Sequence, residues 1–216
     1  MAMTLAQLEH DLSDLIGVGV YNTIFLPSGQ TTWVDQAINW GHQQIAALLG
    51  LTRVDAMILV SGNPSIQIVI PSDAIKPVTV QAWWTPTGGA LMGKMLYEST
   101  LTIEDAKNPN WRARTGEPTV WMQFDGSTIF LNGIPTTGSV VLGYIQVPTP
   151  MVNATDTPDP RIPDYFHEYI KFAAAAWLLL QAGQAEDRKK ASEMYAKFTT
   201  SLGLGPLPLA STTVAR

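Results

Sequence analysis

Residues 162–183 read IPDYFHEYIKFAAAAWLLLQAG, and the burial that this segment requires constrains how the rest of the chain can fold. Within it, residues 172–180 form a run in which every side chain is aliphatic or aromatic. A helix that is apolar on all faces lies either in lipid or deep inside protein. A bilayer span needs about 20 apolar residues, whereas the charged Asp164, Glu168 and Lys171 directly precede this run. We therefore predict a helix that is buried inside protein, and no membrane segment.

The composition indicates that other proteins cover part of the surface of this chain. Charged residues make up 14 % of the chain, against about 25 % in soluble domains, while hydrophobic residues reach 46 %. Because so few charges cover a monomer poorly, we infer that protein neighbours occupy part of the surface. The net charge of -5 argues against a grip on nucleic acid, which needs clustered Lys and Arg. The N-terminus has no basic region of the kind found in secretory signals, so we expect synthesis in a cytosol.

Helical signals lie at both ends of the chain. Thr4 and Gln7 form a capping-box signature in front of a helix that Gly17 ends. Apolar residues at helical spacing predict a second helix, which starts near Thr31 or Thr32 and ends at Gly50. Two further helices are predicted over residues 163–181 and 185–202.

Between residues 51 and 148 the apolar period changes from 3.6 to 2, which is typical of strands. The pair Asp125-Gly126 predicts a tight hairpin, and IPTTG at 134–138 predicts a second turn that pairs the strands on either side of it. We expect residues 102–114 to be irregular, with one short helical turn. The seven predicted strands cover residues 56–62, 65–71, 78–84, 94–100, 119–124, 128–132 and 139–147.

These elements predict an α+β fold. The terminal helices form an antiparallel helical bundle, and an antiparallel β-sandwich or rolled sheet is inserted between them. Four consecutive alanines, Ala173 to Ala176, allow neighbouring helices to approach closely, and we expect part of the apolar run to face a second copy of the chain. The predicted domains are a bundle of residues 1–50 and 160–202, a β-rich insertion of residues 51–159 and an extended C-terminal tail of residues 203–216, which we expect only a partner to order.

The sequence contains few residues in patterns that are typical of catalysis or of metal and cofactor binding. His10 and His42 lie among polar helical residues, which favours a solvated helix surface for both. His167 has Asp164 one turn away but no third ligand at helical spacing, so a metal site there is weakly supported. The sequence has no G-x-S-x-G elbow, and its glycine clusters lack the strand and helix that flank a phosphate loop. We therefore predict no catalytic residues, no metal and no cofactor; a hydrolase that uses His167 is the least favoured hypothesis.

Trp83 and Trp84 are candidates for binding. Adjacent residues of a strand face opposite sides of a sheet, so one tryptophan enters the core and the other points outward. An outward tryptophan either stacks on sugar rings or anchors a protein interface. The low surface charge favours the protein interface, and a carbohydrate- or receptor-binding module that uses Trp83 and Trp84 remains the alternative.

The chain resembles a known protein family in the order of its elements rather than in any single motif. A capped first helix precedes W-V-x-x-A-I-N-x-G-x-x-x-I-A-x-L-L at 33–49, and IVIPSD (68–73), GEPTVW (116–121) and YIQVPTP (144–150) follow in the β-rich middle. IPDYFHEYIKFAAAA at 162–176 then opens the closing helices. Over residues 4–202 the chain resembles the adaptor, or head-to-tail connector, proteins of tailed bacteriophages. The loop at 17–30 and the apolar tail depart from that pattern.

The resemblance implies a structural virion protein without catalysis, assembled in the host cytoplasm and placed in the neck of the particle. It implies a ring, commonly of twelve copies, beneath the capsid portal. Such a ring extends the DNA channel, lets DNA pass without specific binding, and offers a surface to the next tail component. By the same analogy Trp83 and Trp84 are candidates for docking that component. The portal-contact candidates are Leu204, Leu207, Leu209 and Val214 of the C-terminal tail.

Overall fold

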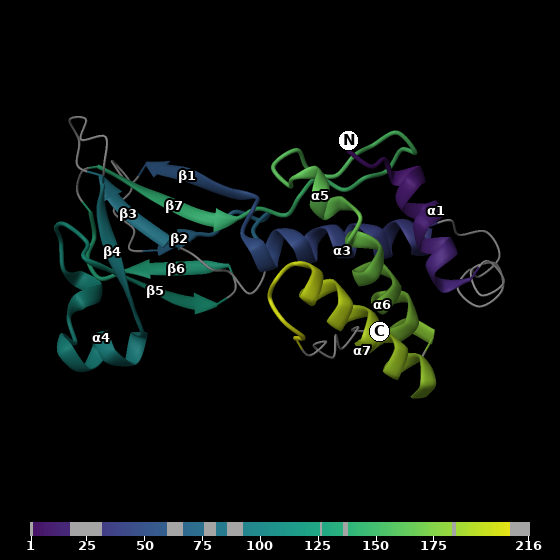
Figure 1. The fold of residues 1–216 in the computed structure, drawn as a ribbon. Coiled ribbons are helices and arrows are strands. Elements are labelled where there is room, and N and C mark those ends of the chain that lie inside the picture. The colour runs from purple at the N-terminus through teal and green to yellow at the C-terminus, as the bar shows by residue number, and fades with distance from the viewer. Residues whose placement is uncertain are drawn as a thin grey trace. The chain divides into compact units, whose positions relative to one another are not determined.

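The structure is a computed structural model that describes residues 2–17, 32–59, 67–75, 81–85, 93–125, 127–135, 138–182 and 185–207. The chain divides into two compact units. Unit 1 comprises residues 1–52 and 148–216, and unit 2 comprises residues 53–147 (Figure 1). The two chain ends therefore belong to one helical unit, and the sheet is inserted between them.

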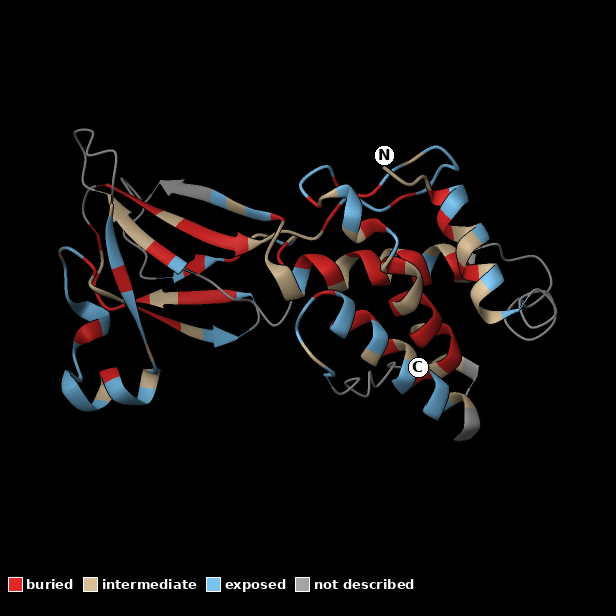
Figure 2. Ribbon diagram, viewed as in Figure 1, coloured by how far each residue is buried: buried red, intermediate tan, exposed pale blue. Residues whose placement is uncertain are grey.

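Unit 1 is a helical bundle. Its helices are α1 (Leu5–Ile16), α3 (Thr32–Leu49), α5 (Asp164–His167), α6 (Ile170–Ala182) and α7 (Ala185–Ser201). Helix α6 contains the apolar run and packs against α1, α3 and α7 (Figure 1). Its residues Ile170, Ala173 to Ala176 and Leu178 are fully buried (Figure 2). The bundle of the same chain therefore covers most of this helix.

Hydrogen bonds between neighbouring residues fix where the helices of the bundle begin and end. The Gln7 N–H donates to Thr4 Oγ1 at 3.3 Å, and the Thr4 N–H donates to Gln7 Oε1 at 2.8 Å, so the predicted capping box is confirmed. Further along, the single helix predicted over 163–181 is divided into α5 and α6. The Tyr169 and Phe172 N–H groups donate to carbonyls three residues earlier, which tightens the chain between the two helices.

Helices α3 and α6 cross closely because small residues lie between them. A Cβ atom placed on Gly41 would lie 2.8 Å from the Ile170 carbonyl oxygen and 3.2 Å from the Ala173 Cβ. Neither atom belongs to a flexible side-chain end that can move away. The alanine run therefore allows the close approach that the sequence predicts, and Gly41 completes it.

Unit 2 is a seven-stranded sheet with the order β1-β7-β3-β4-β5-β6-β2. One buried cluster includes Ala82, Leu96, Trp121, Leu131 and Leu142, which belong to five different strands. Because strands across the whole sheet share that cluster, the sheet curls around its own core (Figure 1). The strands are β1 (Arg53–Leu59), β2 (Gln67–Val69), β3 (Gln81–Thr85), β4 (Lys94–Ser99), β5 (Val120–Asp125), β6 (Thr128–Leu131) and β7 (Ser139–Ile145).

One strand pair differs from the antiparallel expectation. Strands β4 and β5 pair in parallel, with Tyr97 opposite Val120. Parallel neighbours need a crossover connection. Helix α4 (Leu101–Lys107) and the 3-10 helix η1 (Trp111–Ala113) form it, where the sequence predicted one short helical turn.

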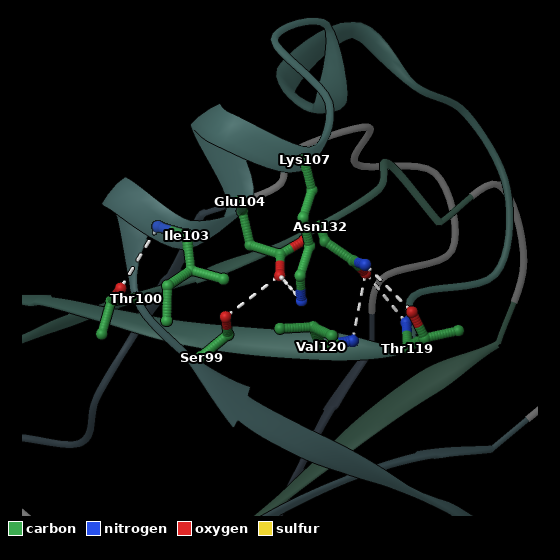
Figure 3. A network of polar contacts seen from close by, with 8 residues as sticks. All are labelled: Ser99, Thr100, Ile103, Glu104, Lys107, Thr119, Val120 and Asn132. Atoms are coloured by element: carbon green, nitrogen blue, oxygen red, sulfur yellow. Dashed lines mark hydrogen bonds and ion pairs between the residues drawn. The ribbon is translucent and has the colours of Figure 1, made fainter.

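Two polar networks hold this crossover on the sheet (Figure 3). The buried Glu104 of α4 accepts hydrogen bonds from Ser99 Oγ at 3.0 Å and Lys107 Nζ at 3.3 Å. Asn132 Oδ1 accepts from the Thr119 and Val120 N–H groups at 2.9 and 3.1 Å. Asn132 thereby satisfies two backbone donors where the crossover returns to β5.

The hairpin predicted at Asp125-Gly126 joins the antiparallel strands β5 and β6. Asp125 Oδ1 accepts from the Ser127 N–H and Oγ at 2.7 and 2.8 Å. The second predicted hairpin, at 134–138, is wrong, because β6 pairs with β5 and β2 while β7 pairs with β1 and β3. Ile134 instead exchanges backbone hydrogen bonds with residues 114 and 116. The predicted α+β class, with packed terminal helices and an inserted β unit, is confirmed.

Candidate interaction surfaces

The two tryptophans of β3 lie on opposite sides of the sheet, as the sequence predicts. Trp84 packs against the buried cluster of unit 2. Its Nε1 is buried, with no acceptor among the described residues. Trp83 lies on the outer face, where the Arg53 guanidinium stands 5.2 Å from the ring centroid. Of the pair, only Trp83 therefore lies on the outer face of the sheet.

Trp83 occupies space that Gly143 leaves open. A Cβ on Gly143 would lie 3.0 Å from the Trp83 ring, 2.6 Å from the Arg53 guanidinium and 2.7 Å from an Asp55 carboxylate oxygen. Arg53 and Asp55 also approach each other, at 3.4 Å. The Trp83 ring is thus half-buried, with the Arg53–Asp55 ion pair beside it.

Exposed apolar residues continue from Trp83 onto the next strand. Met95 of β4 is the register partner of Trp83. Tyr97 lies two residues further along β4 and so on the same face. Met95 is 52 % exposed and Tyr97 is 70 % exposed. Sequence reasoning missed both residues, because the pairing of β3 with β4 is needed to place them beside Trp83.

The C-terminal candidates begin at the end of α7. Leu204 and Leu207 are 40 % and 39 % exposed. The Leu204 N–H donates to the Thr199 carbonyl at 3.0 Å, and the Leu207 N–H donates to Thr199 Oγ1 at 3.2 Å. The expectation that only a partner orders the tail is therefore wrong for residues 203–207, because Thr199 holds their backbone. Leu209 and Val214 lie outside the described residues.

His42 is buried, so its predicted place on a solvated helix surface is wrong. It accepts a hydrogen bond on Nε2 from the Asp159 N–H at 3.0 Å. It shares the buried stripe of α3 with Ile38 and Ile45, and that spacing was the available signal. Burial lowers the pKa of His42 to about 4, which keeps the ring neutral near neutral pH. His10 is exposed, as predicted, with Nδ1 3.3 Å from Asp14.

His167 has a structural role in the fold. Its side chain is buried, Nδ1 accepts from the Met3 N–H at 3.4 Å, and Nε2 lies 2.9 Å from the Ile162 carbonyl. Both ring nitrogens therefore have partners in backbone groups of unit 1. In the described parts of the chain, no three His, Asp or Glu side chains are grouped so as to hold a metal ion.

None of the described helices has the length and apolar character required to cross a membrane. The described residues form a helical bundle with a curled sheet inserted into its chain, and they expose apolar side chains such as Met95, Tyr97 and Leu204. Residues 3–214 match the family model of the SU10 adaptor protein. The chain therefore belongs to the SU10 adaptor protein family, and the resemblance to phage adaptors is confirmed. No curated protein matches the chain. Membership indicates a structural role in the phage particle rather than a catalytic one.

Proposed function

We propose that the chain forms an adaptor ring that joins the capsid portal to the tail and extends the DNA channel. The observation that carries this proposal is the family match over residues 3–214. A ring of about twelve copies, beneath the portal and in the neck of the virion, is the assembly that we expect. DNA passes through its lumen without specific binding, consistent with the net charge of -5.

Each unit exposes apolar side chains that suit such an assembly. On unit 2, Met95 and Tyr97 lie beside Trp83, and we assign this face to the next tail component. On unit 1, Leu204 and Leu207 leave the end of α7 with exposed side chains, and we assign them, with Leu209 and Val214, to the portal. A tail fixed at its base by Thr199 loses less conformational freedom when it binds than an unattached one.

A carbohydrate- or receptor-binding module at Trp83 and Trp84 is the second candidate, and the geometry gives it less support. Sugar stacking needs an open ring face. The Trp83 ring carries Arg53 over one face, and Trp84 packs against the core. The adaptor is therefore the function that the arrangement of these residues favours.

Imaging tests the proposal directly. The purified chain is mixed with the portal protein of the same phage and viewed by negative staining, and we expect an added ring of density on one end of the portal. A Leu204→Ser/Leu207→Ser variant is expected to lose that ring, while Val152→Ser, at an exposed loop residue, is the matched control. Portal particles that stay unchanged at saturating wild-type chain would refute the proposal.

A further inference from the structure

The C-terminal segment folds back on the helix that it leaves. Helix α7 ends at Ser201, and Gly203 adopts a φ of +77°, a left-handed conformation that glycine tolerates. The Leu204 N–H then donates to the Thr199 carbonyl at 3.0 Å, and the Leu207 N–H donates to Thr199 Oγ1 at 3.2 Å. Leu207 therefore lies beside the last turn of α7 rather than beyond its end.

A shallow groove begins next to this point. It has a volume of about 750 Å³ and runs between α6 and α7, which pack side by side (Figure 1). Most of the surface inside it is apolar. Its lining consists of Phe172 from α6 and, from α7, Glu193, Ala196, Lys197, Thr200 and Ser201. Because Ala196 and Thr200 flank Thr199 on α7, the groove is adjacent to the residue that holds the tail.

The residues that follow Leu207 suit an apolar groove with an aromatic side chain. Residues 206–210 read PLPLA, so Leu209 is the next large apolar residue. Pro208 fixes its own φ and favours an extended conformation for Leu207, which lowers the entropy that the segment loses on binding. Extended segments that contain proline commonly bind grooves with aromatic linings.

The segment is also long enough to fill the groove. A helix rises about 1.5 Å per residue, so the lining between Ser201 and Glu193 spans about 12 Å. An extended chain covers about 3.3 Å per residue, so about four residues are enough. Nine residues, 208–216, follow Leu207 in the sequence and lie outside the described residues.

We propose that residues 208–211 occupy this groove on their own chain, with Leu209 against Phe172. A segment that is tethered beside its site meets it at an effective concentration in the millimolar range, which the tail of a second copy in dilute solution does not match. The contact goes beyond the proposed function and does not depend on it. If the portal binds Leu209, it must displace this residue from the groove, whereas Leu204 and Leu207 stay exposed.

Disulfide formation tests the contact in the full-length chain, which contains no cysteine of its own. The variant Leu209→Cys/Lys197→Cys joins the segment to the groove. The control Leu209→Cys/Ser192→Cys uses an exposed residue of α7 that does not line the groove. In dilute protein under mild oxidation, we expect the first pair to form an intramolecular disulfide about tenfold faster than the control. Non-reducing electrophoresis and mass spectrometry measure both rates, and circular dichroism checks that each variant is folded.

Blocking the groove provides a second measurement. Ala196→Arg places a long side chain in the groove and should slow the Leu209→Cys/Lys197→Cys pair about tenfold, to the rate of the control pair. Gln36→Arg, at an exposed position of α3, is the matched control and should leave the rate unchanged.

Equal rates for the two cysteine pairs would overturn the inference, because a tail outside the groove meets both positions of α7 alike. Disulfide-linked dimers in place of the intramolecular product would also overturn it, since the groove would then hold the tail of a second copy. The experiment contains no portal, so its failure leaves the adaptor function standing. Portal particles that gain no ring would in turn leave the groove contact standing.

Discussion

At the scale of single residues, the crossing of α3 and α6 depends on Gly41. Replacing a helical glycine by alanine ordinarily stabilises a helix by up to about 1 kcal/mol. Here the new Cβ would meet the Ile170 carbonyl oxygen at 2.8 Å. We expect Gly41→Ala to lower the free energy of unfolding by about 1–3 kcal/mol, because the packed bundle must shift.

Urea denaturation followed by circular dichroism measures this change. The exposed Gln36→Ala on the same helix is the control, and it should stay within about 0.5 kcal/mol of wild type. A stabilised Gly41→Ala protein would mean that α3 and α6 do not approach as described.

His42 makes the stability of unit 1 depend on pH. Its pKa is about 4 in the folded chain against 6.5 for the free group, so the unfolded chain binds more protons between these values. The contribution is fully present above pH 6.5 and is lost as the pH falls toward 4, by about 3 kcal/mol in all. As the pH is lowered from 7.5 to 4.5, the urea concentration at the midpoint of unfolding should fall less for His42→Gln than for wild type. Parallel pH profiles of the two proteins would argue against a buried neutral ring.

At the scale of elements, the contact between α1 and α3 contains two carboxyl groups. Burial, together with the hydrogen bond and the charge of Asp35, raises the pKa of Glu9 from 4.5 to about 7. The favourable protonated contact is complete below pH 4.5 and is lost as the pH rises toward 7. Because Glu9 is partly exposed, solvent screening reduces the effect, and we expect Glu9→Gln to stabilise the chain by only about 1 kcal/mol at pH 8. Thermal unfolding at pH 8 and pH 4 measures it; equal gains at both pH values would contradict the pairing.

Asn132 holds the crossover that makes β4 and β5 parallel. Asn132→Ala leaves the Thr119 and Val120 N–H groups without their acceptor, which should cost about 2 kcal/mol of unfolding free energy. Hydrogen exchange at these two amides should accelerate more than at Trp121. Thr102→Ala, at an exposed position of α4, serves as the control. Unchanged protection at Thr119 and Val120 would mean that Asn132 does not hold this segment.

Features encoded by neighbouring residues could be predicted from the sequence, and features that depend on distant pairing could not. The capping box at Thr4 and the apolar run of α6 are local patterns, so both were found. The parallel pairing of β4 with β5 is set by the crossover, which no alternation of residues reveals. The surface beside Trp83 shows the same limit, because Met95 joins it only through strand register.

At the scale of the whole molecule, we propose that other protein, including further copies of this chain, covers its exposed apolar surface. The low proportion of charged residues in the sequence indicated that other proteins cover part of the surface. The structure locates exposed apolar residues on the outer sheet face and at the end of α7, whereas α6 is covered mainly by its own bundle. The next tail component and the portal are therefore assigned to these outer surfaces, and no partner is assigned to the apolar run itself.

Native mass spectrometry of the portal complex tests this claim most directly. Twelve chains of 23.5 kDa add about 280 kDa to the portal, and we predict a single added mass near that value. Intermediate masses should be rare at saturation, because each added copy creates a contact for the next. A portal that gains single chains independently, or a chain that remains monomeric with portal in excess, would contradict the account.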